Sequence, residues 1–354
     1  MIQITLALPF GLPPPELAPD LQRALKTPAL AALLSRTSNA QVHPAEDGAR
    51  ALPHEAWLAR ALGLLGSGAQ ADGAPVAAAA MHGYGQAPSE GYWFIVQPIH
   101  VQLARTHLTL ADPRQLRLEE ADARTLFELA QPLFEESGKP LVYGDAGTWF
   151  MRADDWADLS TATPDTATSM NLSDWMPEGP NAIAFRKLQN EIQMLWHEHA
   201  VNEARQARGL TPVNSFWLWG GAAAPAPATA ARKTLAVAGA PAWLAALGRP
   251  SLRGATLAQL LAHPADGDDQ GPRIALLGDL MESGGGGDWS DWLMHMQRLE
   301  QDWFAPLLAA LHDGRVARVK LVLSHRTRLA EFTSTKNAQR KFWRKHTLNN
   351  LVPS

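Results

Sequence analysis

The last third of the chain alternates between extended and helical patterns, and this alternation most constrains the fold. From residue 213 onward, short apolar runs such as "RIALL" and "VKLVLSH" are separated by segments with helical spacing of apolar residues. Repetition of strand, helix and strand is typical of a largely parallel sheet covered by helices. The first residues, "IQITLAL", followed by helical spacing, extend the same pattern. We therefore expect an α/β fold.

The middle of the chain has a different pattern. Residues 91–112 read as two extended segments, and helical spacing follows at 118–137 and again over one long helix at 181–208. A length of 354 residues also exceeds one average domain. We therefore expect residues 1–83 and 213–354 to form one α/β unit, interrupted by an α+β insert at 84–212.

The stretch "NSFWLWGG" follows this expected insert. Alternation along a strand places Phe216 and Leu218 on one face and Trp217 and Trp219 on the other. Strands with two apolar faces are typical of the interior of a parallel sheet. We expect the two tryptophans to pack rather than to bind a ligand, and the strand to return the chain from insert to core.

Composition excludes several classes of function. The formal charge is -4, so no basic surplus is present to neutralise a phosphate backbone, and we expect no nucleic-acid partner. No apolar run approaches the roughly 20 residues of a membrane helix, and the first residues lack a basic leader. The chain has no cysteine. We expect a cytoplasmic protein that does not bind membranes.

Two side chains stand at the ends of expected strands, where ligands of open α/β sheets bind. Asp279 follows the run "RIALLG", and His325 ends the run "VKLVLS". The glycines of "ESGGGGDW" match neither the dinucleotide fingerprint nor the Walker pattern, so they form either an anion-binding loop or a plain connection. A hydrolase triad around His325 lacks its Gly-x-Ser-x-Gly elbow.

The segment 197–221 resembles cofactor-independent phosphoglycerate mutases of the archaeal type. In that family a helix carries His-Pro-Val-Asn-x-x-Arg, followed by Gly, by Pro and Asn, and by an apolar strand that ends in glycines. The matching positions here are His199, Asn202, Arg205, Gly209, Pro212, Asn214 and Gly220, with Ala200 in place of the family's proline. The alternative for the helix is a plain surface pair of His199 and Glu203; the His-Glu-x-x-His zinc spacing is absent.

This resemblance implies an alkaline-phosphatase-like, three-layer α/β sandwich with a mainly parallel sheet, and a bacterial, regulatory-type branch of the mutase-like proteins. It also implies a two-metal site of Asp and His ligands with a Ser or Thr nucleophile. Only Asp279 and His325 can be matched to those ligands, since "LALPFG" has no acid after the first strand and Ser324 replaces the late Asp. Two hard cations need about six ligands each, which two residues cannot supply.

We therefore expect a catalytically impaired relative, a pseudoenzyme with a ligand-binding or regulatory role and no cofactor. His199, Asn202, Arg205 and Asn214 are the expected ligand-binding residues, because a guanidinium suits a phosphorylated or carboxylated small molecule. Asp279 and His325 are the expected remnants of the catalytic site. Two alternatives stay open: an active phosphomutase or phosphatase with a partial, rebuilt Mn or Mg site, and a protein-interaction module.

Overall fold

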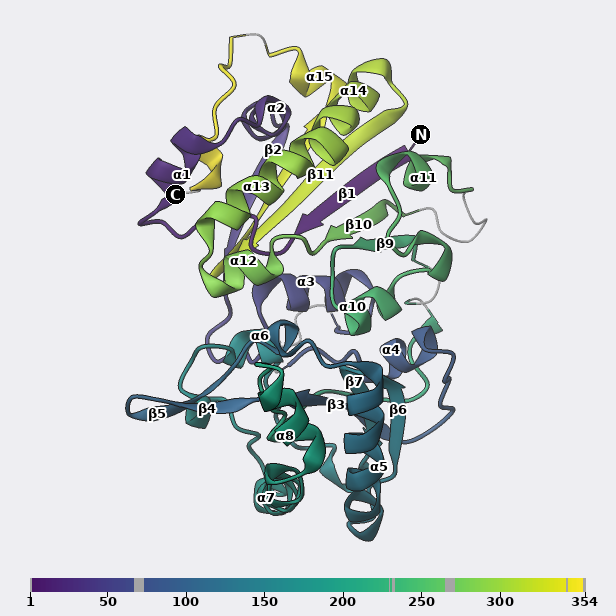
Figure 1. Cartoon of the computed structure of the whole chain (residues 1–354). Helices are drawn as coiled ribbons and strands as arrows, with labels where there is room; N and C mark the ends of the chain where they lie inside the picture. The colour runs from purple at the N-terminus through teal and green to yellow at the C-terminus, as the bar shows by residue number, and fades with distance from the viewer. Residues whose placement is uncertain are drawn as a thin grey trace. The chain divides into compact units, whose positions relative to one another are not determined.

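The chain divides into two compact units in the computed structural model (Figure 1). The structure describes residues 2–66, 73–228, 230, 233–264, 271–341 and 343–352. One unit, called here the core unit, comprises Met1–Ala45 and Ala231–Ser354, and the other, the insert unit, comprises Glu46–Ala230. No helix in the described ranges is long and apolar enough to cross a membrane.

A mainly parallel sheet forms the centre of the core unit. Its order among the described residues is β2-β12-β11-β1-β10-β9, and β11, β1, β10 and β9 are mutually parallel. The remaining two strands pair antiparallel at one side. The strands are β1 (Ile2–Leu8), β2 (Asn39–Pro44), β9 (Leu235–Ala238), β10 (Arg273–Leu277), β11 (Val316–His325) and β12 (Arg328–Thr335). The expected α/β class with a mainly parallel sheet is confirmed.

Helices connect these parallel strands, as the alternation predicts. Strand β1 is buried from Ile4 to Leu8, which fits an interior strand between β10 and β11. Figure 1 shows α13 and α14 lying along one face of the sheet. The helices are α1 (Ala18–Ala24), α2 (Pro28–Ser35), α10 (Ala242–Leu247), α11 (Leu257–Ala262), α12 (Met281–Gly286), α13 (Trp289–Leu299), α14 (Ala305–Asp313) and α15 (Lys336–Gln339).

A π-helical turn, Glu300–Phe304, joins α13 to α14 and caps a distant helix. The buried Glu300 carboxylate accepts hydrogen bonds from the backbone amides of Ala29 (2.6 Å) and Leu30 (3.1 Å). These amides open α2, whose Thr27 N-cap makes no side-chain capping bond. A carboxylate therefore stabilises the partly positive end of α2 in place of a local cap.

The insert unit is built on a four-stranded antiparallel sheet in the order β6-β7-β3-β8. Helices α5 and α7 pack together over a core rich in aromatic residues. The strands are β3 (Tyr92–Ile99), β6 (Leu141–Asp145), β7 (Thr148–Arg152) and β8 (Ser215–Ala223), with a separate hairpin of β4 (Val101–Ala104) and β5 (His107–Leu110). The helices are α3 (Pro53–Ala61), α4 (Ala77–Gly83), α5 (Glu120–Glu136), α6 (Pro164–Ala167), α7 (Ala182–His197) and α8 (Ala200–Ala207).

The stretch "NSFWLWGG" belongs to the insert unit, contrary to the expected return to the core. Strand β8 pairs antiparallel with β3, so it is not an interior strand of the parallel sheet. Both of its faces are apolar because α7 and α4 both pack against it. Trp217 and Trp219 are fully buried, and the Trp217 indole donates to the Ala162 carbonyl (2.7 Å).

The unit boundaries differ accordingly from those expected at residues 84 and 212. Residues 46–83, which carry α3 and α4, and residues 213–230, which carry β8, lie in the insert unit. Strand pairing decides this assignment, since β8 makes its ladder with β3 rather than with β1 or β9.

Candidate functional site

The carboxyl ends of β10, β1 and β11 meet at one edge of the core unit's sheet, because these strands are parallel neighbours. Asp279 stands two residues beyond β10, and His325 is the last residue of β11. The two residues that the sequence predicts as catalytic remnants therefore lie at the same edge, on strands separated by β1.

Asp279 is turned away from β11. A Cβ atom placed on Gly239 would lie 2.6 Å from the Asp279 carboxyl carbon, so the carboxylate rests against the loop that follows β9. In the sheet order, β9 lies on the far side of β10 from β1 and β11. Gly239, at φ +62°, is the residue that leaves room for this carboxylate. The structure thus places Asp279 and His325 at one edge without directing them at each other.

Phe10 occupies the end of the central strand β1, where the resemblance to the mutases implies an acid. Its side chain is buried, and its backbone has φ 57°, an uncommon value for a residue other than glycine. The Phe10 amide donates to the Ser324 hydroxyl (3.3 Å), and its carbonyl accepts from the Trp292 indole (2.9 Å). The central position of this edge is therefore packed with an aromatic ring.

His325 lies beside two arginines at the other end of the edge. Its strand turns tightly into β12, with His325 opposite Arg328 in the ladder. Burial lowers the pKa of His325, Arg328 and Arg326 lower it further, and Glu16 opposes them. Burial and the two arginines therefore favour the neutral form of the ring. Its Nδ1 atom is buried and has no hydrogen-bond partner among the described residues.

The glycine run "ESGGGG" is not a loop. Residues Met281–Gly286 form α12, and Gly287 ends it in the left-handed conformation. Gly284 packs against Phe10, because a Cβ at this position would lie 2.5 Å from the Phe10 Cβ. Both expectations for this run, an anion-binding loop and a plain connection, are wrong: close packing of a short helix on Phe10 requires glycine there.

Two of the residues from the mutase-like segment, Asn202 and Arg205, are buried in the insert unit and hold its backbone. The Asn202 amide nitrogen donates to the carbonyls of Trp196 (2.8 Å) and Val213 (2.7 Å), and its oxygen accepts from the Val213 amide (2.8 Å). Arg205 donates to the carbonyls of Thr211 and Leu116 and pairs with Asp122 (3.3 Å).

The other two residues of that segment also make backbone contacts. The Asn214 side chain bonds both the amide and the carbonyl of Val101, each at 2.8 Å. The single helix expected over 181–208 is broken at His199, whose Nδ1 accepts from the Val201 amide (3.3 Å) and so caps α8. Backbone hydrogen bonds of this kind account for the polar side chains of His199, Asn202, Arg205 and Asn214. Ligand binding by these four residues stays a prediction.

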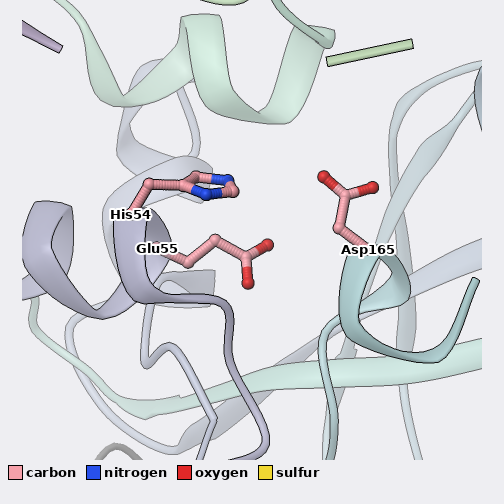
Figure 2. A group of neighbouring side chains, drawn as sticks. All are labelled: His54, Glu55 and Asp165. Carbon is pink, nitrogen blue, oxygen red and sulfur yellow. The ribbon is translucent and has the colours of Figure 1, made fainter. Parts of the chain in front are cut away.

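A third group, which the sequence reasoning missed, lies in the insert unit. His54 and Glu55 stand in the first turn of α3, and Asp165 stands in the first turn of α6. Figure 2 shows their three side chains pointing toward a common space. Their donor atoms lie within 4.8 Å of one another, and no other group of three His, Asp or Glu side chains does so in the described ranges.

Sequence separation hid this group, since more than a hundred residues divide α3 from α6. The available signal was local. In both "LPHE" and "TPD" a proline opens a helix and is followed at once by an acid or a histidine. Such residues at a helix start are common and gave no indication that the two turns meet.

The buried cluster has unusual electrostatics. All three residues are at most 7% exposed. Burial raises the pKa of Glu55 to about 8, and the neighbouring Asp165 carboxylate adds to the rise. Hydrogen bonds from the Thr163 hydroxyl and the Leu52 amide, both 2.7 Å, and the charge of Arg114 act in the opposite direction. A carboxylic acid that holds its proton near neutral pH is the result.

Comparison with solved structures gives several matches, among them two distant neighbours. No family model and no curated protein matches the sequence. A cofactor-independent phosphoglycerate mutase from Thermoplasma acidophilum is 13% identical with a TM-score of 0.46, covering 100% of this chain and 95% of the mutase. The PH0037 protein from Pyrococcus horikoshii is 11% identical with a TM-score of 0.48, covering 94% of this chain and 87% of that one. Likeness at this level carries no conclusion about activity.

Proposed function

We propose that this chain is a diverged, phosphoglycerate-mutase-like protein that binds an anionic small molecule and does not transfer phosphoryl groups. The ligand, a phosphorylated or carboxylated metabolite, binds at the carboxyl end of β11. The buried Nδ1 of His325, which has no partner among the described residues, is the observation that carries this proposal. A polar atom in that position is expected to bond a ligand or water.

Charge at this end of the sheet supports an anion. Arg326 and Arg328 flank His325 closely enough to lower its pKa. Guanidinium groups suit phosphate and carboxylate through paired hydrogen bonds. A neutral imidazole can add one N–H donor without a protonation step.

The donor set at this edge supports loss of the two-metal reaction. A two-metal site holds its ions about 3.5–4 Å apart and needs several carboxylate and imidazole ligands that converge. Here the buried Phe10 follows the central strand β1, and the Asp279 carboxylate contacts the loop after β9. Among the described residues of this edge, no group of three His, Asp or Glu side chains is placed to bind the two ions that would stabilise a transferring phosphoryl group.

Binding and turnover are tested with the full chain. Thermal shift and calorimetry with inorganic phosphate, 2-phosphoglycerate, 3-phosphoglycerate and a dicarboxylate are expected to detect a ligand. The His325→Gln and Arg326→Gln variants are expected to weaken its binding at least about tenfold, the effect of losing one hydrogen bond to a charged group. Arg315→Gln is the control, because Arg315 precedes the opposite end of β11.

The outcomes separate the alternatives. Hydrolysis of a phosphate ester with added Mn²⁺ that is lost in Asp279→Ala would contradict the proposal and favour an active metal enzyme. No shift with any small molecule would favour an interaction module.

A further inference from the structure

We propose that His54, Glu55 and Asp165 bind one divalent transition-metal ion, with Zn²⁺ preferred, inside the insert unit. One imidazole nitrogen and two carboxylate oxygens are a donor set that Zn²⁺ and Mn²⁺ accept. The three donors come from two helix starts, α3 and α6, so the ion would join these two turns. The proposal does not rest on the anion site, whose residues belong to the core unit.

One atom of Glu55 points to a missing ligand. The Oε2 atom is held by the Leu52 amide and the Thr163 hydroxyl, each at 2.7 Å. The Oε1 atom is buried and has no hydrogen-bond partner among the residues described. Glu55 as a residue is 5% exposed, and its carboxylate is directed at the other two members of the cluster (Figure 2). A buried oxygen fixed in this way is ready to coordinate a cation.

The charge count also fits a divalent ion. Glu55, Asp165 and Asp112 are three buried acids, and the Arg114 guanidinium pairs with Asp112 and Asp165. An ion that binds Glu55 displaces the proton that this acid holds in the metal-free protein. With all three acids then ionised, two negative charges are left in a buried site. One divalent cation balances that excess, whereas a monovalent ion or a single proton does not.

Surrounding residues hold the ligands in place, as is usual around protein metal sites. Arg114 pairs with Asp165 and Asp112, with N–O distances of 2.9 Å to each. Thr163 caps α6 through its hydroxyl, which also bonds Glu55. Metal bonds of about 2.0–2.2 Å place tetrahedral donors about 3.4 Å apart, so donors now within 4.8 Å need only small side-chain rotations.

Helix starts carry partial positive charge, which favours anions over cations. Here that charge acts first on the Glu55 and Asp165 side chains, which stand in the same turns and lie between the helix starts and the ion. Three protein donors leave further coordination positions for water, so the site needs no fourth side chain.

The experiment uses the full chain stripped with a chelator and then titrated with Zn²⁺, Mn²⁺ or Mg²⁺ by calorimetry. The expected result is one Zn²⁺ per chain, with Mn²⁺ weaker and Mg²⁺ weakest. Glu55→Gln and Asp165→Asn each remove a ligand charge and are expected to weaken Zn²⁺ binding by about 100-fold or more. Asp112→Asn alters only the support of Arg114, and a loss of about 10-fold is expected.

Two controls keep the result decisive. Glu128→Gln, an exposed acid of α5, is expected to bind Zn²⁺ like the unchanged chain. Because a cluster variant can fail to fold, Co²⁺ is also added to the unchanged chain, where visible absorption bands of an N/O-ligated ion are expected and are removed by one equivalent of Zn²⁺. Equal Zn²⁺ affinity in the unchanged chain and a folded Glu55→Gln variant, or no Co²⁺ band, would overturn the proposal.

Discussion

The buried Glu55 carboxyl should make the metal-free protein lose stability as pH rises. Its pKa is raised from 4.5 to about 8, first by burial and then by the Asp165 carboxylate. His54, Arg114 and Asp112 are the other charged or titratable groups of the cluster. Between pH 4.5 and about pH 8, the unfolded chain has released the Glu55 proton and the folded chain still holds it. Stability from this group is therefore complete below about pH 4.5 and declines as pH rises toward 8.

The size of the effect follows from the shift. About 3.5 pKa units at 1.36 kcal/mol each give at most about 5 kcal/mol, of which about 3 kcal/mol is lost by pH 7. Glutamine mimics the protonated acid: it keeps an oxygen for the Leu52 amide and the Thr163 hydroxyl, and it cannot ionise. In Glu55→Gln this part of the pH dependence should therefore disappear.

Urea unfolding in chelator, followed by tryptophan fluorescence at pH 5, 6, 7 and 8, measures this difference. The stability of the unchanged chain relative to Glu55→Gln is expected to fall by about 3–4 kcal/mol between pH 5 and pH 8. Glu128→Gln should show no such trend, because Glu128 is exposed. A constant difference between the unchanged chain and Glu55→Gln across this range would refute the reasoning.

Two further predictions concern buried charges that hold the fold. Glu300→Gln leaves the first turn of α2 without its carboxylate cap and should reduce core-unit stability by about 1–2 kcal/mol in urea unfolding, whereas Asp302→Asn, exposed on the same π turn, should not. Arg205→Met removes the donor to the carbonyls of Leu116 and Thr211 and one of the two guanidinium partners of Asp122, which keeps Arg208, and should reduce insert-unit stability by about 1–3 kcal/mol. If Arg205→Met instead unfolds like the unchanged chain but no longer binds an anion, the structural reading of Arg205 is wrong.

The fold class could be predicted because it depends on local patterns. The apolar runs that became β1, β10 and β11 are short, bounded and separated by helical segments, and parallel pairing follows from that spacing. The strand β8 could not be placed in the same way. Two apolar faces show only that both are covered, and α4 and α7 cover them in an antiparallel sheet as well as any helices could in a parallel one.

The candidate sites were predictable only in part. A residue at or just beyond the carboxyl end of a parallel strand lies at that edge of the sheet, independently of the other contacts of the chain. Asp279 and His325 could therefore be placed there. The orientation of the Asp279 side chain depends on the space left by the missing Cβ of Gly239. The sequence pattern does not show that these two residues are in contact. The cluster of His54, Glu55 and Asp165 depends on the meeting of two distant helix starts, and that contact exists only in the folded insert unit.

Binding of a phosphate ester with and without metal tests the central claim most directly. Calorimetric titration of 3-phosphoglycerate into the full chain, once in chelator and once with excess Mn²⁺, compares the two conditions on one sample. We predict the same affinity in both, with no release of inorganic phosphate and no conversion to the 2-phospho isomer. Binding that requires Mn²⁺, or turnover that appears with it, would contradict the proposal that this protein binds an anion and has lost metal-dependent phosphoryl transfer.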